Sequence, residues 1–318
     1  MFDDFERKND YNLLMKNLIE ENKCYMTLIE SRMFRTELTK KKIKKAIKKF
    51  DFNMARNFFE EVKTQYRLKE SGINNEIVNN SEDLYSNYFS KDRIAIYTCI
   101  FGKYDSIQEP MCIPDNCDYY IITDLQLSKS SLWKPIQIDE SKFEIENMTA
   151  AEKNRFFKMH PHLLFPEYDY SIYVDGNIKI IADPTAFVNR IGKWGIAMHS
   201  HSRRECVYDE ITACDIYRRE PKESLERQKK LLHDEGLPKK YGMCECNIIA
   251  RRHNDEKVIT MMEQWWTYYR QYAKRDQLSW PLVLYKNGIK TSEITTLGSN
   301  VGRNYSVRIV RHELMQKV

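Results

Sequence analysis

Residues 150–181 read AAEKNRFFKMHPHLLFPEYDYSIYVDGNIKII, and this stretch decides the fold. Its first part predicts a helix, because apolar side chains between positions 156 and 163 recur at spacings of three and four residues. Its second part predicts a strand, since Tyr170 to Val174 is short, β-branched and aromatic and stops at the Asp-Gly-Asn turn 175–177. A carboxylate at the end of a buried strand is costly unless something compensates its charge. This turn is therefore the first candidate for a functional site.

The turn offers two oxygen-bearing side chains, Asp175 and Asn177. In an open α/β sheet, ligands bind outside the carboxyl ends of the strands. Carboxylate and amide oxygens suit a hard divalent ion such as Mg²⁺ or Mn²⁺, which fills its other positions with water and substrate phosphates. As a bare pattern, the same triplet is also typical of an ordinary β-turn. The metal-site interpretation therefore depends on the rest of the sequence.

The segment NRFFKMHPHLLFPEYDYSIYVDGNI, residues 154–178, resembles the core signature of the DUF616-type family of glycosyltransferases. Three further segments resemble the family in the same order: RIAIYTCIFGKYD at 93–105, HSRRECVYDE at 201–210 and RDQLSW at 275–280. The resemblance implies a GT-A-like α/β fold, with a mixed, mostly parallel sheet flanked by helices. This sequence departs from the GT-A pattern at Asn177, which stands in the place of the second acid of the Asp-x-Asp motif.

The resemblance also implies a function. It suggests a hexosyltransferase that moves a sugar from a nucleotide-sugar, most simply a UDP-sugar, to a glycan or lipid-linked acceptor during polysaccharide synthesis. The divalent ion, Mn²⁺ or Mg²⁺, would be held by Asp175 and Asn177. Two alternatives stay open: a noncatalytic protein that keeps the GT-A-like fold, and a basic protein that binds nucleic acid or a membrane surface.

The chain of 318 residues is long enough to bury a substantial core. We expect an α-helical region at 1–88 and a GT-A-like domain at 89–318. No apolar run approaches the roughly 18 residues that cross a bilayer, and the acidic start at Met1 to Asp4 is unlike a secretion signal. The eight cysteines contain no C-x-x-C pair, which favours reduced thiols and a cytoplasmic protein.

The region before residue 88 carries a basic amphipathic pattern. Seven lysines lie between Lys40 and Lys49, and an apolar stripe runs on one helical face from Ile43 to Tyr66. One interpretation is a solvated helix that packs by its stripe onto a neighbour. The other is a segment, residues 40–66, that makes peripheral contact with the anionic inner face of a membrane, as would suit a lipid-linked acceptor. The net charge of +5 permits an anionic partner, but no nucleic-acid motif accompanies the lysines.

The donor nucleotide is expected at the end of the first strand of the catalytic domain. Residues 94–100 form a near-continuous apolar run, typical of a strand covered on both faces, which leads into a glycine-containing turn. A simple strand-to-loop turn is the alternative. The expected donor contacts in this segment are Thr98, Phe101, Gly102 and Tyr104. By resemblance, Asp124 at the end of the next strand joins them.

The predicted helix at 152–162 carries Arg155 and Lys158, which share a face because they are three residues apart. Both cations could therefore reach one diphosphate. At the end of the same helix, His160 and His162 are interpreted as caps that complement the helix dipole.

A strand at 194–199 places His199 and His201 on the same side of an extended chain. We expect one structural histidine and one substrate contact, and we assign the donor contact to His199. Glu210 begins a long charged helix predicted to reach about residue 234, and it either contacts a sugar or complements the helix dipole.

Arg275 to Gln277 follows a helix with an apolar core stripe. The resemblance places this tripeptide at the active site, with Asp276 as general base or sugar ligand and Gln277 beside it. An inverting reaction would need a carboxylate to take the acceptor proton, with Asp276 the first choice and Glu210 the second. A retaining reaction needs no such base, and the sequence does not decide between the two.

Overall fold

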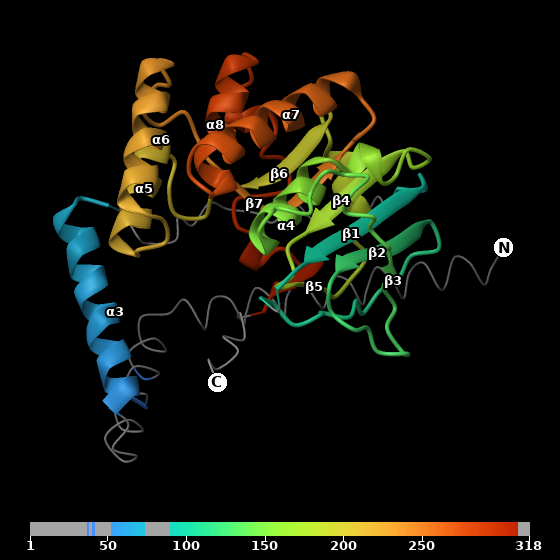
Figure 1. Ribbon diagram of the computed structural model, residues 1–318, viewed down its shortest axis with the longest axis horizontal. Helices are drawn as coiled ribbons and strands as arrows, with labels where there is room; N and C mark the ends of the chain where they lie inside the picture. Colours follow the sequence, from blue (N-terminus) through green and yellow to red (C-terminus); the bar gives the residue numbers. More distant parts are fainter. Residues whose placement is uncertain (1–36, 38–39, 42–51, 74–89, 103, 311–318) are drawn as a thin grey trace, which may run out of the picture.

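The computed structural model describes residues 37, 40–41, 52–73, 90–102 and 104–310, with the side chains of 52–59 left out. Its centre is a six-stranded sheet of order β3-β2-β1-β4-β7-β6 (Figure 1). The strands are β1 Ile94–Ile100, β2 Cys117–Thr123, β3 Lys134–Pro135, β4 Tyr170–Val174, β6 Ile196–Ser200 and β7 Cys244–Arg251. β3, β2, β1 and β4 pair in parallel, whereas β7 is antiparallel to both β4 and β6. The expected mixed, mostly parallel α/β sheet is confirmed.

Three helices cover one face of the sheet: α4 Ala150–Met159, α7 Glu256–Gln271 and α8 Asp276–Lys286 (Figure 1). Their largest apolar side chains, including Phe157, Trp265 and Trp280, pack on Tyr97 of β1 and Tyr173 of β4. Every second residue of these strands points to this face, as the two-residue period of a strand requires.

The opposite face of the sheet is covered by short elements. They are the two-stranded sheet of β5 Ile178–Ile180 and β8 Val307–Ile309, and the 3₁₀ helices η2 Thr185–Arg190 and η4 Val301–Arg303. Ile96 and Ile172 of the main sheet pack against Phe187 and Val307 there. Burial on both faces explains why β1 is apolar along its whole length. The remaining 3₁₀ turns are η1 Pro161–Leu163 and η3 Thr291–Glu293.

The expected single helix over 208–234 is wrong. Two helices occupy this stretch, α5 Val207–Ile216 and α6 Lys222–Asp234. The chain leaves the helical conformation at Arg218, whose φ is 54°, and Pro221 precedes the first residue of α6. Proline lacks the N–H that a continuing helix would need, so the break has a local cause.

The helix α3 Phe52–Glu70 extends away from the body of the molecule (Figure 1). It contacts the body near its carboxyl end, where Leu68 and the following Ile73 pack on Ala213 and Ile216 of α5. Two members of the predicted apolar stripe, Val62 and Tyr66, are 50% and 61% exposed. The rest of the stripe and most of the 1–88 region lie outside the described side chains. So does His312, for which the resemblance to GT-A enzymes raises the question of whether a histidine near the carboxyl end closes over the metal.

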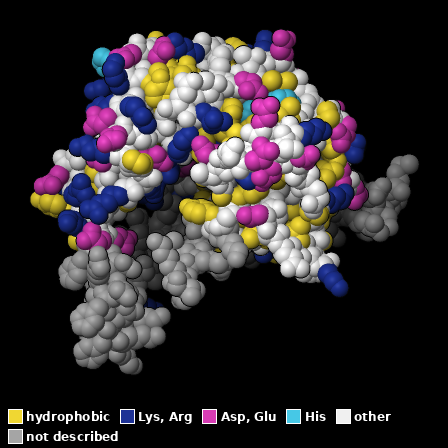
Figure 2. Space-filling view, in the orientation of Figure 1, with side chains coloured by type: hydrophobic (Ala, Val, Ile, Leu, Met, Phe, Trp, Pro, Cys, Tyr) yellow, Lys and Arg dark blue, Asp and Glu magenta, His cyan; other side chains and the backbone are white. Residues whose placement is uncertain are grey.

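Charged groups of both signs are interspersed over the face of the molecule shown in Figure 2. The described cysteines are free thiols, and six of the seven are buried. Within the described part of the chain, no helix has the length and apolar character needed to cross a membrane.

Candidate active site

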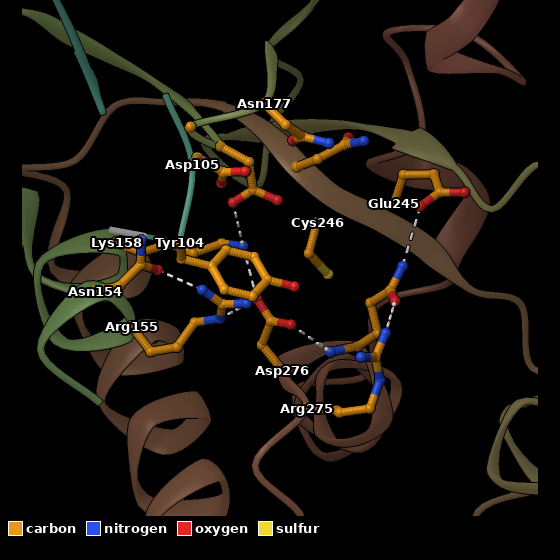
Figure 3. Close-up of a pocket in the computed structure, with 14 residues that line it drawn as sticks. Tyr104, Asp105, Asn154, Arg155, Lys158, Asn177, Glu245, Cys246, Arg275 and Asp276 are labelled. Carbon is orange, nitrogen blue, oxygen red and sulfur yellow. Dashed lines mark hydrogen bonds and ion pairs between the residues drawn. The ribbon is translucent and has the colours of Figure 1, made fainter. Parts of the chain in front are cut away.

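A pocket of about 220 Å³ opens beyond the carboxyl ends of β1 and β4 (Figure 3). β2 and β4 flank β1 on opposite sides, so the pocket lies where the strand order of the sheet reverses, the usual ligand position in such folds. We call it the reaction pocket. Its lining comes from the loop after β1, α4, the turn after β4, the start of β7 and the amino end of α8: Tyr104, Asp105, Asn154, Arg155, Lys158, Asp175, Gly176, Asn177, Glu245, Cys246, Asn247, Arg275, Asp276 and Gln277.

Two cations of α4 converge on one carboxylate of α8. Lys158 Nζ lies 2.6 Å from Asp276 Oδ2, and Arg155 Nε lies 3.0 Å from the same oxygen. Lys158 also lies 3.4 Å from Asp175 Oδ1. Its side chain is only 1% exposed, so these carboxylates are the partners that make its burial tolerable. The shared helical face expected for Arg155 and Lys158 is present in the structure.

Asp276 is strongly stabilised in its ionised form. Burial by itself would raise the pKa of the Asp276 carboxyl, but Arg155 and Lys158 outweigh burial and hold the pKa far below its usual value. Its position at the first residue of α8 adds the favourable field of a helix amino end. A carboxylate held in this way is a weak proton acceptor, so the geometry favours Asp276 as a residue that positions cations or a sugar hydroxyl.

The Asp-Gly-Asn turn projects into the reaction pocket. Tyr173 Oη donates a 2.8 Å hydrogen bond to Asp175 Oδ1, the same oxygen that Lys158 approaches. Gly176 has no room for a side chain, because a Cβ there would lie 2.9 Å from Ile100 Cγ1 and 3.0 Å from Asp105 Oδ2. The Asp105 carboxylate therefore lies directly against the turn. A third oxygen-bearing side chain thus accompanies Asp175 and Asn177.

Asp105 was not among the predicted site residues, although it is the acid that closes the 93–105 motif. It lies on the same side of the pocket as Asn177, opposite Asp276 (Figure 3). The described residues contain no group of three or more His, Cys, Asp or Glu side chains arranged to hold a metal. Asp105, Asp175 and the Asn177 amide are oxygen-bearing groups among the pocket-lining residues, and a Mg²⁺ ion is usually held by one or two carboxylates together with water and substrate oxygens.

Glu245 is a second pocket residue that the sequence analysis missed. Gln277 Nε2 donates to Glu245 Oε2 at 3.1 Å, while the hydroxyl and the backbone N–H of Ser202 lie 3.1 and 3.3 Å from Oε1. In contrast to Asp276, this carboxylate is held by neutral donors. The available signal was the two-residue alternation of β7, in which Cys244 and Cys246 are buried while Glu245 is half-buried and faces the pocket.

The predicted donor contacts of β1 and β2 fall in different places. Tyr104 lines the pocket and is 68% exposed. The Gly102 N–H donates to both carboxylate oxygens of Asp124, at 3.1 and 2.9 Å, so Asp124 ties together the loops after β1 and β2. Phe101 stacks on Phe157 of α4. Thr98 is buried within β1, and neither it nor Phe101 lines the pocket.

His199 and Glu210 do not line the pocket either. His199 is fully buried in β6, with Nε2 lying 3.0 Å from Asn304 Nδ2, and burial lowers its pKa to about 3. Glu210 is 1% exposed and accepts a hydrogen bond from Arg204. Both are core groups in this structure, so the geometry gives no support to a donor contact at His199 or to a base at Glu210. His160 ends α4, with its Nδ1 lying 2.6 Å from Phe156 O, in the capping position expected.

Two solved structures of glycosyltransferases are similar to part of this chain. The apo structure of WbbM, a bifunctional glycosyltransferase, matches with a TM-score of 0.38 and 11% identity over 70% of this chain and 41% of that chain. The mannosyltransferase Ktr4p from S. cerevisiae matches with a TM-score of 0.34 and 12% identity over 70% of this chain and 74% of that chain.

At the level of sequence, the protein described as "Probable hexosyltransferase MUCI70" from Arabidopsis thaliana is 23% identical over 226 residues. The match covers 63% of this chain and 38% of the plant protein, so this chain corresponds to a minor part of that relative's length. The family model for the TOD1/MUCI70 glycosyltransferase-like domain matches residues 62–312. That match includes every side chain of the reaction pocket and well over half of the chain. This chain therefore belongs to the TOD1/MUCI70 glycosyltransferase-like family.

Proposed function

We propose that this protein transfers a hexose from a nucleotide-sugar, a UDP-sugar in the simplest case, to a glycan or lipid-linked acceptor in the synthesis of a surface polysaccharide. The observation that carries the proposal is the convergence of Arg155, Lys158, Asp175 and Asp276 on one pocket at the carboxyl ends of β1 and β4. These residues come from sequence segments far apart in the chain, and they are the charged groups that breakage of a sugar–diphosphate bond requires.

The main chemical task in this reaction is to stabilise the leaving diphosphate. Glycosyl transfer passes through an oxocarbenium-like state while negative charge accumulates on the departing phosphate. Arg155 and Lys158 already lie beside each other, because Asp276 holds both through one oxygen. Cations fixed in this way need little reorganisation when charge develops, which is the condition for effective electrostatic catalysis. Arg275 on the pocket wall is a third cation of this set.

The lining is nevertheless short of positive charge. Four carboxylates, those of Asp105, Asp175, Glu245 and Asp276, face three cations in the pocket. A diphosphate would add further negative charge, so we propose that a divalent ion, Mn²⁺ or Mg²⁺, enters with it at Asp105, Asp175 and Asn177. When bound, the ion would supply Lewis-acid stabilisation of the diphosphate. Tyr173 and Lys158 would orient the Asp175 carboxylate by their contacts with Oδ1.

A protein base that takes the proton of the acceptor hydroxyl is needed only if the reaction inverts the configuration at the sugar carbon. We assign that step to Glu245, because its carboxylate faces the pocket and neutral groups hold it. Asp276 is less suited, since Arg155 and Lys158 depress its pKa. In a retaining reaction the leaving phosphate can take the proton, and Glu245 would then orient the acceptor.

We further propose a cytoplasmic location with peripheral membrane contact through residues 40–66. The observations that support contact are the seven lysines at 40–49 and the exposure of Val62 and Tyr66 on α3. Sedimentation with anionic liposomes should decrease when residues 1–85 are removed. Equal sedimentation of the full and shortened proteins would contradict membrane contact through this region.

A thermal-shift screen tests the proposed function. UDP-, GDP-, CMP- and ADP-sugars are added with and without Mn²⁺ to the wild type, to Asp175→Ala and to Glu226→Ala, a control at an exposed site on α6. A ligand that binds only the folded state raises the melting temperature. We expect one nucleotide class to do so in a Mn²⁺-dependent manner in the wild type and the control, and not in Asp175→Ala. A wild type that responds to no nucleotide-sugar would favour the noncatalytic alternative.

A further inference from the structure

A second and larger cavity, about 560 Å³, opens where β6 ends and the loop 238–243 approaches β7. We call it the lysine cavity. Its third wall is η3, and the complete lining is Ser200, His201, Arg204, Glu205, Pro238, Lys239, Lys240, Tyr241, Gly242, Met243, Lys290, Thr291, Ser292, Thr295 and Ser299. None of the residues of the reaction pocket is among them. The proposed function therefore leaves this cavity without a role.

The lysine cavity carries uncompensated positive charge. Lys239, Lys240 and Lys290 are exposed, and within the described part of the chain none of their ammonium groups forms an ion pair. Glu205 is the single acid among the lining residues. The carboxylate nearest in sequence to Lys290, Glu293, is bound by Lys193 at 2.8 Å. Like charges that share one cavity repel one another, so an anion bound between them would be stabilised.

The base of the cavity is rigidly built. Tyr241 Oη donates to Ile289 O at 2.8 Å, and Thr291 Oγ1 donates to Tyr241 O at 2.9 Å. Gly242 has a φ of 99°, and a Cβ at this position would lie 2.6 Å from Thr291 Cβ. These contacts join the loop 238–243 to η3 at close range. Lys240 and Lys290 therefore project from a fixed frame, and the hydroxyls of the lining offer hydrogen bonds that suit a sugar.

The lysine cavity adjoins the reaction pocket through the start of β7. Met243 lines the lysine cavity, while Glu245 and Cys246 line the reaction pocket. Three residues of an extended strand span about 10 Å. Glu245 stands at the junction, since one of its oxygens is held by Gln277 in the reaction pocket and the other by Ser202, close to His201 of the lysine cavity. A chain of sugars could therefore extend from the lysine cavity into the reaction pocket.

We propose that the lysine cavity binds an anionic substituent, a carboxylate or a phosphate ester, of the acceptor glycan, while the hydroxyl that attacks the sugar carbon lies in the reaction pocket. The acceptor of this enzyme is accordingly an acidic oligosaccharide. The inference rests on the proposed function, because it names the acceptor of the same site. The hydroxyl side chains among the lining residues favour a glycan over a lipid headgroup as the carrier of the charge.

The test is calorimetric binding to the 318-residue chain. The first probe is a tetrasaccharide that contains glucuronate, and the second is the same tetrasaccharide with its carboxylates converted to methyl esters. The third is a tetrasaccharide of neutral sugars whose only charged group is one phosphate monoester. The variant is Lys239→Gln combined with Lys240→Gln and Lys290→Gln. The matched control is Lys229→Gln, an exposed lysine of α6 that forms no ion pair among the described residues.

We expect the wild type and Lys229→Gln to bind an acidic tetrasaccharide and the triple variant to bind it about tenfold more weakly. Binding should weaken with added salt, and the methyl ester should bind no better to the wild type than to the triple variant. Equal affinity of the wild type and the triple variant for both acidic probes would overturn the proposal. So would lysine-dependent binding to vesicles that contain phosphatidylserine without binding to either acidic probe, since the partner would then be a lipid surface.

The nucleotide-sugar thermal shift of the triple variant separates the two proposals. It should equal that of the wild type, because the three lysines lie outside the reaction pocket. If the acidic probes bind through the lysines but no nucleotide-sugar binds the wild type, the proposed function fails and the lysine cavity remains an acidic-glycan site. If nucleotide-sugars bind and the acidic probes do not, the lysine cavity assignment fails alone.

Discussion

Asp276 and Glu210 are both buried carboxylates in the first turn of a helix, and each is held by cations. Asp276 at α8 contacts Lys158 and Arg155, and Glu210 at α5 contacts Arg204. Only Asp276 borders the reaction pocket. A buried ion pair is therefore assigned to the reaction site only where the reaction pocket reaches it, and Glu210 serves the core.

The ion pairs of Asp276 and Glu210 also differ in how fully protein contacts surround their charged groups. Lys158 lies between two carboxylates, at 2.6 Å from Asp276 and 3.4 Å from Asp175, and the latter is 27% exposed. An incoming phosphate could therefore share Lys158. Glu210 is enclosed by Arg204, by His201 at 3.7 Å and by the Cys214 thiol at 3.6 Å, with no opening to the reaction pocket. We expect mutations at the first cluster to change both nucleotide-sugar binding and stability, and mutation of Glu210 to change stability without changing nucleotide-sugar binding.

The largest effect is expected from Lys158→Met. It leaves the buried Asp276 with a single close cation, and the loss of one partner of a buried pair costs about 3–5 kcal/mol of the free energy of unfolding. Nucleotide-sugar binding should be lost as well. Urea denaturation and thermal shifts measure both, with Lys153→Met on the same helix as the control, because Lys153 pairs with Glu140 near the surface. A stability loss of less than about 1 kcal/mol would show that Lys158 is not an essential partner of Asp276.

Glu210→Gln should lower the free energy of unfolding by about 2–3 kcal/mol, because the charged hydrogen bond to Arg204 is lost and the guanidinium stays buried. The nucleotide-sugar thermal shift should keep its wild-type size. Each shift is taken relative to the melting temperature of the same protein without ligand, which keeps the loss of stability separate from any loss of binding. If the shift disappeared in a folded variant, Glu210 would belong to the reaction site and the contrast with Asp276 would fail.

Gly176→Ala probes the turn itself. The added methyl group would meet Ile100 and the Asp105 carboxylate at 2.9 and 3.0 Å, and overpacking of this kind costs about 1–3 kcal/mol. Displacement of Asp105 should also weaken binding of Mn²⁺ alone, measured by calorimetry. Gly288→Ala is a control in an open position, although its φ of 67° adds local strain. Unchanged Mn²⁺ affinity in Gly176→Ala would remove Asp105 from the proposed ion site.

The pH dependence of the free energy of unfolding tests whether the buried histidines are neutral in the folded protein. Burial lowers the pKa of His199 to about 3 and that of His253 to about 4, from an ordinary value of 6.5. Below pH 6.5 the unfolded chain therefore binds protons that the native state does not. Each histidine should lower the free energy of unfolding by up to about 1.4 kcal/mol per pH unit as the pH falls from 6.5 toward 4.

Urea denaturation at several pH values measures this slope. His199→Gln should give a shallower fall than the wild type, since the variant lacks one of the histidines whose pKa burial lowers. An equal slope in the wild type and in His199→Gln would show that His199 does not stay neutral in the folded protein.

Local patterns were sufficient for much of the fold and for part of the site. The apolar runs of β1 and β4, the Asp175 turn and the shared face of Arg155 and Lys158 follow from spacing and strand composition alone. The break between α5 and α6 also had a local signal in Pro221. That signal was outweighed by the charged helical pattern on either side of it.

Contacts between residues distant in the chain determined the features of the site that local sequence patterns did not predict. His199 and Glu210 occur in motifs that resemble active-site segments, yet both are enclosed by the core. Asp105 and Glu245 were missed because their importance depends on Gly176 and Gln277, which are distant in the chain. The reduced basicity of Asp276 likewise arises from Arg155 and Lys158, more than a hundred residues away in the sequence.

The most direct test of the central claim is the release of nucleoside diphosphate from a nucleotide-sugar in the presence of Mn²⁺. It compares the wild type with Asp175→Ala and with the surface control Glu226→Ala. We predict measurable release by the wild type and the control, and none above background by Asp175→Ala, because that variant loses a carboxylate that lines the reaction pocket and contacts Lys158. Equal release by all three proteins would contradict the assignment of the reaction pocket.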